Sequence, residues 1–247
     1  MVAQSRSKIV LLTRPLSQSE DFAQVLQQRV AAPLSILISP LMRAEFLNPP
    51  IPARQFAAVI FTSQTAVAAA RRIIANGITM PGRAFCVGQE TARLARLAGF
   101  EALSANGDSG AILAMIATQK LSGPLLHLRG VISTGSIKDA LVSAGIETVE
   151  AVVYQQITQS LSDAARTILS KPEPVFIPLF SPRSASIFSA EIQNCTVIAP
   201  LYIAAMSPSV AQKARTLPDA TIQTALSPDA SGIINTLLAL FALDCTP

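Results

Sequence analysis

Phe61-Thr62-Ser63-Gln64-Thr65-Ala66 is the stretch that decides the fold, because it returns as Leu179-Phe180-Ser181-Pro182-Arg183-Ser184 at a spacing of 118 residues. In both copies an apolar segment ends at a serine that can cap a following helix, which is typical of a strand-to-helix junction. Three more pairs recur in the same order at spacings of 115 to 122 residues: Leu11–Arg14 with Leu126–Arg129, Val87–Ala92 with Met206–Ala211, and Ser109-Gly110 with Ser231-Gly232. A period of this length indicates two related α/β units rather than a solenoid.

Strand-like and helix-like segments alternate along the whole chain, which favours parallel sheets with helices on both faces. The strand that ends in the repeated arginine comes first in one unit and late in the other, so we expect the units to be interleaved. The expected boundaries are residues 1–36 with 158–247 for one domain, 48–148 for the other, and 37–47 and 149–157 for two antiparallel linker strands.

The composition favours a core-rich globular protein. Of 247 residues, 50% are apolar and 14% are charged, with a formal net charge of +4 and a pI near 9.3. The sequence has no run of Lys or Arg of the kind that binds nucleic acid. Its mildly positive net charge would favour the binding of an anionic small molecule. No segment has the apolar length of a membrane span or the pattern of a signal peptide. Cys86, Cys195 and Cys245 lack the spacing of a zinc site or a disulfide framework, which fits a cytoplasmic protein.

The predicted strand-to-helix loops are rich in hydroxyl groups and glycine and poor in charge. In parallel sheets ligands bind beyond the carboxyl ends of the strands, where the following helices present free N–H groups and the positive end of their dipoles. Candidate binding residues in these loops are Arg14, Thr62, Ser63, Gly88, Thr91, Arg129, Gly130, Ser181, Ser207 and Ser209. Each hydroxyl alone is better explained as an ordinary helix cap, whereas the set on two units favours a polyanion.

Motifs for other chemistries are missing from the sequence. No GxGxxG follows a predicted strand, and no P-loop is present. The single histidine, His127, lies inside an apolar run, where we expect a structural role, and no catalytic triad or carboxylate pair is evident. We therefore expect no metal and no strong nucleophile, and what remains is binding, orientation and one weak acid.

Tyr154 is the candidate for that acid. It is one of two tyrosines and lies on an unusually long β-rich segment, Glu147–Ile157, which we expect to cross between the domains. A phenol in this place can donate a proton or a hydrogen bond into a cleft. It is equally satisfactory as an amphipathic residue of a half-buried ribbon, and both interpretations stay open.

Taken together, these motifs resemble the uroporphyrinogen-III synthase family. The resemblance rests on Thr13-Arg14-Pro15, Ala58–Val67, Val87–Ala92, Leu128-Arg129-Gly130, Val152-Val153-Tyr154, Phe180-Ser181-Pro182 and the C-terminal Ser-Gly helix. It implies two flavodoxin-like domains joined by a two-stranded linker, without a cofactor. It also implies a monomer that dehydrates and cyclises hydroxymethylbilane, an octacarboxylate linear tetrapyrrole, to uroporphyrinogen III. Ring D is inverted through a spiro intermediate, and hydroxymethylbilane synthase is the implied upstream donor.

The resemblance also implies roles for particular residues. Tyr154 matches the linker tyrosine of the family, which is the candidate proton donor. The residues that match motif positions near the tetrapyrrole are Thr62, Ser63, Gly88, Thr91, Arg129, Gly130, Ser181 and Ser209. The chain departs from the family pattern at Gln64, where a proline is usual, and at Ser207 and Val210, where a glycine and a threonine are usual.

Two alternatives belong to other classes of protein. A non-catalytic two-domain α/β module that binds a small anion would share the same loops. A nucleotide-binding regulator built from receiver-like domains is less favoured, because the first strand does not end in the required acidic cluster.

Overall fold

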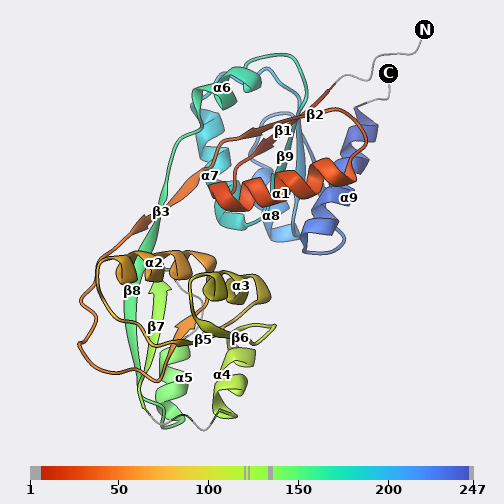
Figure 1. Cartoon of the computed structure of the whole chain (residues 1–247). Helices are drawn as coiled ribbons and strands as arrows, with labels where there is room; N and C mark the ends of the chain where they lie inside the picture. Colours follow the sequence, from red (N-terminus) through yellow and green to blue (C-terminus); the bar gives the residue numbers. More distant parts are fainter. Residues whose placement is uncertain (1–6, 120, 122, 133–135, 245–247) are drawn as a thin grey trace. The chain divides into compact units, whose positions relative to one another are not determined.

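The chain folds into two compact units, each built on one sheet (Figure 1). The computed structural model describes residues 7–119, 121, 123–132 and 136–244. One unit comprises Met1–Arg43 and Ile157–Pro247, and the other comprises Ala44–Gln156. The predicted fold class, two interleaved α/β units with parallel sheets, is confirmed.

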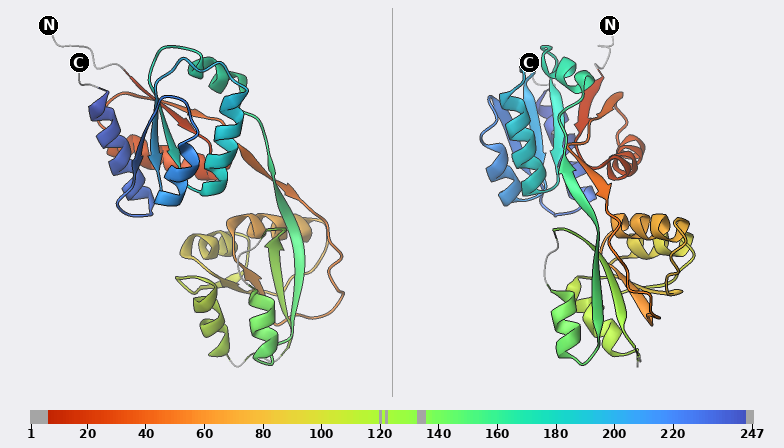
Figure 2. Two further views of the ribbon diagram at one scale, coloured as in Figure 1. Left: turned by 180° about the vertical axis from the view of Figure 1, so that it is seen from behind. Right: turned by 90° about the vertical axis from the view of Figure 1, so that its left-hand side faces the viewer.

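The first unit has a five-stranded parallel sheet in the order β11-β10-β9-β1-β2. Its strands are β1 (Lys8–Leu12), β2 (Leu34–Ile38), β9 (Val175–Leu179), β10 (Leu201–Ala205) and β11 (Ala220–Thr224). Its helices are α1 (Leu16–Arg29), α6 (Asp163–Leu169), α7 (Pro182–Gln193), α8 (Pro208–Ala214) and α9 (Ala230–Leu243). Helices α1 and α9 cover one face and α6 to α8 the other (Figure 2), so consecutive β1 residues Val10 and Leu11 enter different cores.

The second unit repeats this design. Its sheet has the order β3-β8-β7-β4-β5-β6. The strands are β3 (Met42–Phe46), β4 (Ala58–Phe61), β5 (Arg83–Cys86), β6 (Glu101–Ser104), β7 (Leu125–Gly130) and β8 (Thr148–Thr158). The helices are α2 (Gln64–Ala75), α3 (Gln89–Leu97), α4 (Ser109–Ala117) and α5 (Ile137–Ser143), with α2 and α3 on one face and α4 and α5 on the other.

The two sheets have the same strand order once the chain is permuted. The first unit has the flavodoxin-like order 2-1-3-4-5, counting β1, β2, β9, β10 and β11 in turn. The second unit has the same order when β7 is counted first and β8 second, followed by β4, β5 and β6. The repeated arginine strands, β1 and β7, therefore occupy equivalent positions, which explains why the sequence repeats are interleaved.

The chain passes between the units along two strands, β3 and β8. The Gln159 N–H donates to the Leu41 carbonyl at 3.0 Å, and the Leu47 N–H donates to the Val153 carbonyl at 2.9 Å. Residue numbers rise along one strand as they fall along the other, so the pair is antiparallel. Because β2 pairs with β1 as far as Ile38, the first crossing strand proper is β3.

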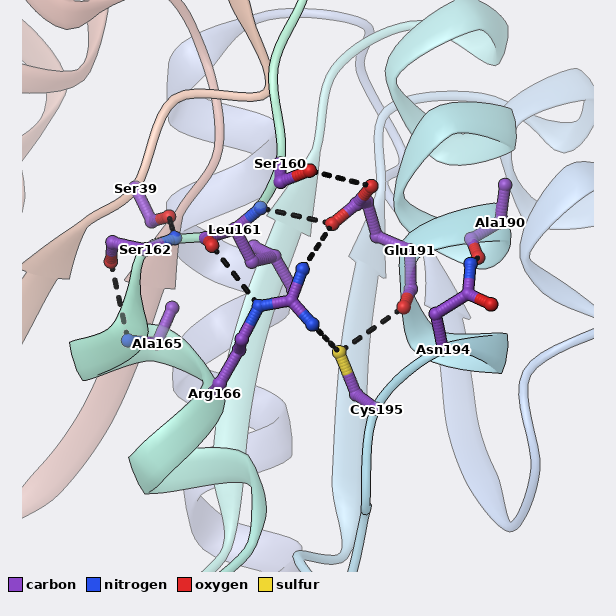
Figure 3. Close-up of polar contacts among 10 residues, drawn as sticks. All are labelled: Ser39, Ser160, Leu161, Ser162, Ala165, Arg166, Ala190, Glu191, Asn194 and Cys195. Carbon is purple, nitrogen blue, oxygen red and sulfur yellow. Dashed lines mark hydrogen bonds and ion pairs between the residues drawn. The ribbon is translucent and has the colours of Figure 1, made fainter.

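A polar network fixes the chain where it leaves β8 and enters α6 (Figure 3). The Arg166 guanidinium pairs with the Glu191 carboxylate at 3.0 Å and donates to the Leu161 carbonyl at 3.2 Å. The same carboxylate accepts the Leu161 N–H at 3.0 Å, and the Ser162 N–H donates to Ser39 Oγ at 2.9 Å. These bonds join α6, α7 and the segment after β2, and so fix the chain where it re-enters the first unit after β8.

Two further observations concern the described residues only. Cys86 and Cys195 are free thiols, and Cys245 lies outside the described residues. Across that part of the chain, no helix combines the length and the apolar character needed to cross a membrane.

Candidate functional site

The sequence-predicted residues gather at the carboxyl edge of each sheet. In the second unit, Thr62 and Ser63 follow β4, Gly88 and Thr91 follow β5, Arg129 and Gly130 end β7, and Tyr154 lies beside them on β8. In the first unit, Arg14 follows β1, Ser181 follows β9, and Ser207 and Ser209 follow β10. The strand order reverses between β4 and β7 in one unit and between β1 and β9 in the other, and ligands of such sheets bind at these points.

Tyr154 is held in direct contact with Ser63 and Gly130. The Tyr154 phenol oxygen lies 3.0 Å from Ser63 Oγ, and the residue is only 9% exposed. A β-bulge between Arg129 and Gly130 shifts the register of β7 and β8 by one residue, so that Gly130, rather than Val131, lies opposite Tyr154. A Cβ at position 130 would lie 2.7 Å from Cζ of the phenol ring and 2.9 Å from its oxygen. Glycine is therefore required here by the close approach of the ring, not by backbone conformation.

Ser63 has a second contact, because it caps α2. Its Oγ accepts the N–H of Ala66 at 3.1 Å, and its backbone is extended, as the cap position requires. The sequence predicted this cap, but the contact with Tyr154 joins residues 91 positions apart. No local pattern signals such a contact, since it depends on the strand order of the sheet, in which β7 lies between β4 and β8.

Arg129 is positioned by a carboxylate that sequence reasoning missed. Glu150 lies on β8, and its Oε2 pairs with Arg129 Nε at 3.0 Å while its Oε1 lies 3.1 Å from His127 Nδ1. The Arg129 Nη1 also donates to the Gly130 carbonyl at 3.0 Å. His127 and Glu150 face each other in the register of β7 and β8, a pairing that sequence spacing alone does not predict.

His127 has a structural place in this cluster. It is 2% exposed, and burial lowers its pKa, although the nearby Glu150 carboxylate acts in the opposite direction. The neutral ring donates its Nδ1 proton to Glu150, and Nε2 has no hydrogen-bond partner among the residues that the structure describes. The ring therefore supports Glu150, which in turn holds Arg129 at the end of its strand.

We expect the free energy of unfolding to decrease as the pH falls below about 6.5, the ordinary pKa of histidine. The pKa of His127 is lowered in the folded state, so the unfolded chain binds the proton first and acidification favours unfolding. One such group changes the stability by at most about 1.4 kcal/mol per pH unit. Urea unfolding between about pH 5.5 and pH 7.5 measures this slope.

The matched control is His127→Asn, whose amide can still donate to Glu150 but does not titrate. His127 is the only histidine in the chain, so the control removes the only side chain whose ordinary pKa lies in this range. An equal slope in both proteins would contradict the buried neutral histidine.

The candidate residues of the first unit have their own local partners. The Arg14 guanidinium stacks 4.1 Å from the centre of the Phe180 ring, and its Nε donates to Gln18 at 3.1 Å. Ser181 caps α7 by accepting the N–H of Ser184 at 3.1 Å. These bonds leave the positive guanidinium and the capped helix beside the reversal point of the sheet.

The candidate positions that follow β5 and β10 differ in burial. Val210 is 1% exposed and packs in the core beneath α8, and Thr91 at the equivalent place on α3 is 8% exposed. By contrast, Ser207 and Ser209 are less buried, and their hydroxyl oxygens lie 2.9 Å apart. The valine therefore replaces a hydroxyl group at a position whose side chain faces the core.

Two cavities lie at the opposite edge of the second sheet. One of about 340 Å³ is lined by Ile78, Met80 and Phe100 among others, and one of about 550 Å³ by Arg83, Arg96 and Glu101. Both lie near the amino ends of β5 and β6, away from Ser63 and Tyr154. Within the described residues, no group of three or more His, Cys, Asp or Glu side chains is arranged to hold a metal ion.

Comparison with known proteins identifies the family. A model of the family described as uroporphyrinogen-III synthase HemD matches residues 20–235. The chain belongs to the uroporphyrinogen-III synthase family. Uroporphyrinogen-III synthases are enzymes of the lyase class, and the resemblance inferred from the sequence is confirmed. No curated protein sequence gives a significant match to the chain.

Solved structures of uroporphyrinogen-III synthases resemble this chain. The enzyme of Helicobacter pylori 26695 matches with a TM-score of 0.60 and 18% sequence identity, over 95% of this chain and 99% of that one. A mutant enzyme of the extremely thermophilic bacterium Thermus thermophilus has a TM-score of 0.49 and 13% identity, over 96% of this chain and 100% of that one. The Helicobacter match supports the fold described above.

Proposed function

We propose that the protein is a uroporphyrinogen-III synthase, which converts hydroxymethylbilane into uroporphyrinogen III and water. The observation that carries the proposal, beside membership of the family, is the Tyr154 phenol held by Ser63 and Gly130 at the carboxyl edge of a sheet. A weak acid in this place suits a substrate that supplies most of its own chemical driving force.

The reaction begins with the loss of the substrate's hydroxyl group. The C–O bond breaks as the hydroxyl oxygen takes a proton and leaves as water, and the adjoining pyrrole nitrogen supplies electrons to form an azafulvene cation. The substituted α-carbon of ring D attacks this cation to give a spiro intermediate. The bond from that carbon to its original methylene bridge then breaks, and the free α-carbon of ring D bonds to the released bridge instead. Loss of one proton from this second α-carbon restores the pyrrole.

Tyr154 is the proposed donor of the first proton. General acid catalysis needs a donor within hydrogen-bond reach of the leaving oxygen, and a phenol is able to fill this role. Cleavage of the phenol O–H bond delivers the proton to the leaving hydroxyl group, and the phenolate is protonated again by the proton that the product releases. The phenol is thereby restored at the end of each turnover.

Isomer selection requires the enzyme to hold one conformation of the chain of pyrroles, because the free bilane closes to the other isomer. The substrate's carboxylates are the groups available for this purpose. We assign their binding to helix N–H groups and side chains at the loop positions predicted from the sequence: Arg14, Thr62, Gly88, Arg129, Ser181, Ser207 and Ser209. Fixing a flexible substrate in a reactive arrangement is itself a large source of rate enhancement.

Ligand selectivity tests this proposal against an anion-binding module without catalysis. The protein is titrated under anaerobic conditions with uroporphyrinogen III, and in parallel with phosphate, a nucleotide and a sugar acid. Tight binding of the tetrapyrrole alone supports the synthase. Equal or tighter binding of a small anion would favour the binding module.

The proposal includes a monomeric, cytoplasmic enzyme that receives its substrate from hydroxymethylbilane synthase. Free bilane closes spontaneously to the other isomer. Rapid transfer of the bilane from hydroxymethylbilane synthase to this protein would reduce that loss. Sedimentation equilibrium, alone and with the upstream enzyme, measures both the oligomeric state and the association. A stable dimer of the chain would contradict the first part.

A further inference from the structure

We propose that Ser63 is a positioning residue for Tyr154, in place of the direct substrate contact that its sequence motif suggests. Its hydroxyl group donates a hydrogen bond to the phenol oxygen, which leaves the phenol's own proton directed to the substrate. This inference rests on the proposed function, in which Tyr154 is the acid.

The contacts of Ser63 favour this direction for the bond. A serine hydroxyl has one proton and two lone pairs, and Ser63 Oγ already accepts the N–H of Ala66 at 3.1 Å. An oxygen that accepts a hydrogen bond becomes a better donor through its own O–H, because the two bonds polarise each other. The remaining partner at 3.0 Å is the Tyr154 oxygen, and we take it as the acceptor of the Ser63 O–H.

This direction serves proton transfer in two ways. A phenol that donated to Ser63 would have its only proton occupied, whereas a phenol that accepts keeps the proton available. As the proton leaves, negative charge develops on the phenol oxygen, and a hydrogen bond to a charged oxygen is stronger than one to a neutral oxygen. Ser63 is the N-terminal cap of α2, a helix of 12 residues. The phenol oxygen bonded to it therefore lies near the helix N-terminus, where the helix dipole also favours negative charge.

Gly130 makes room for the Tyr154 ring because it has no side chain. The ring occupies the space that a Cβ at position 130 would fill, at 2.7 Å from Cζ, and the tyrosine is 9% exposed. The phenol is therefore fixed from one side by the backbone of β7 and at its oxygen by Ser63. The equivalent serine of the first unit, Ser181, instead lies 2.9 Å from the hydroxyl oxygen of Ser184.

A double-mutant cycle distinguishes positioning from direct substrate binding. The turnover number kcat and KM for isomer III are measured for the unaltered protein, Ser63→Ala, Tyr154→Phe and the double variant. We expect Ser63→Ala to lower kcat by about 3- to 10-fold, the contribution of one hydrogen bond, with little change in KM. In the Tyr154→Phe background the same change should alter kcat by less than about 2-fold. Ser63→Thr, which keeps the hydroxyl group, should restore most of the activity.

Ser162→Ala is the control for the lost helix cap. Ser162 caps α6 by accepting the N–H of Ala165 at 3.2 Å, and it has no proposed part in the site. The Ser162→Ala variant should unfold at a urea concentration lowered to a similar extent as in Ser63→Ala, and it should keep its kcat. Losses from Ser63→Ala and Tyr154→Phe that multiply, or a rise in KM without a fall in kcat, would overturn the positioning role.

A spectroscopic measurement separates this inference from the proposed function. The chain contains two tyrosines, so the ¹³Cζ resonance of Tyr154 is assigned by its loss in Tyr154→Phe. If the unaltered protein makes no isomer III, the proposed function fails. A Tyr154 resonance that shifts in Ser63→Ala then still supports the hydrogen bond, and an unchanged resonance refutes it.

Discussion

Tyr154→Phe is expected to slow the formation of uroporphyrinogen III by about 10-fold or more, which lies within the range of general acid catalysis. The substitution removes one oxygen and retains the ring, which packs against Gly130 in the core beneath α2. The fold should therefore persist, and kcat should fall more than KM changes. The measurement is the initial rate of isomer III formation at saturating bilane, with circular dichroism to verify folding.

Tyr202→Phe provides the matched control. Tyr202 is the other tyrosine of the chain and stacks on Phe176, with ring centres 4.9 Å apart, in the first unit. It lies on β10, remote in its sheet position from the loops of the proposed site, and its loss of a hydroxyl group should leave the rate unchanged. Equal rates for Tyr154→Phe and the unaltered protein would leave Tyr154 a structural role only.

Gly232→Ala is expected to lower the free energy of unfolding by about 2 kcal/mol or more. Alanine favours a helix over glycine by about 1 kcal/mol, so propensity alone predicts stabilisation. At this position, however, a Cβ would lie 2.1 Å from the Ser227 carbonyl oxygen, and the main chain before α9 would have to move. Overpacking costs about 1–3 kcal/mol and occasionally more. A clash with a main-chain atom belongs at the upper end of this range, so a net loss of about 2 kcal/mol or more remains after the propensity gain.

The repeat supplies the control, because Gly110 is the counterpart of Gly232. Both N–H groups donate to a capping aspartate, at 2.9 Å for Gly110 and 2.7 Å for Gly232. A Cβ at Gly110 would meet only the Asp108 carboxylate oxygen, at 3.3 Å. Gly110→Ala should therefore be neutral or slightly stabilising in urea unfolding. Equal effects of the two substitutions would contradict the difference in packing.

The sequence was sufficient to predict the layered architecture. The serine caps at Ser63 and Ser181 follow apolar strands, and the late position of the Arg129 strand predicts an interleaved pair of units. These features depend on local chemistry and on the order of segments along the chain, and both survive in the folded state. The permuted strand order then follows from the same repeats.

Contacts between residues on different strands were beyond sequence reasoning. The bonds from Glu150 to His127 and Arg129, and from Ser63 to Tyr154, depend on the strand register and on a bulge at Gly130. The exact start of β10 was also not predictable. The apolar run before it predicts a strand from Val197, yet β10 begins at Leu201, after Pro200. Pro200 has no N–H to donate to a neighbouring strand, although its carbonyl accepts the Val175 N–H at 3.0 Å.

The role of a hydroxyl position likewise depends on the direction of its side chain. Thr91 resembles a binding residue in the sequence, yet it is buried against the sheet, as is Val210 at the equivalent position. Both lie in the first turn of a helix whose inner side chains pack on strands. Helical periodicity indicates which positions face the sheet, but the loop motif alone does not.

The central claim is tested most directly by a coupled assay of isomer composition. Porphobilinogen and hydroxymethylbilane synthase generate the bilane, the protein is added, and the oxidised uroporphyrins are separated by chromatography. The synthase predicts that isomer III predominates and that its share increases with the amount of protein. Isomer I at the spontaneous level, from protein shown to be folded, would contradict the account.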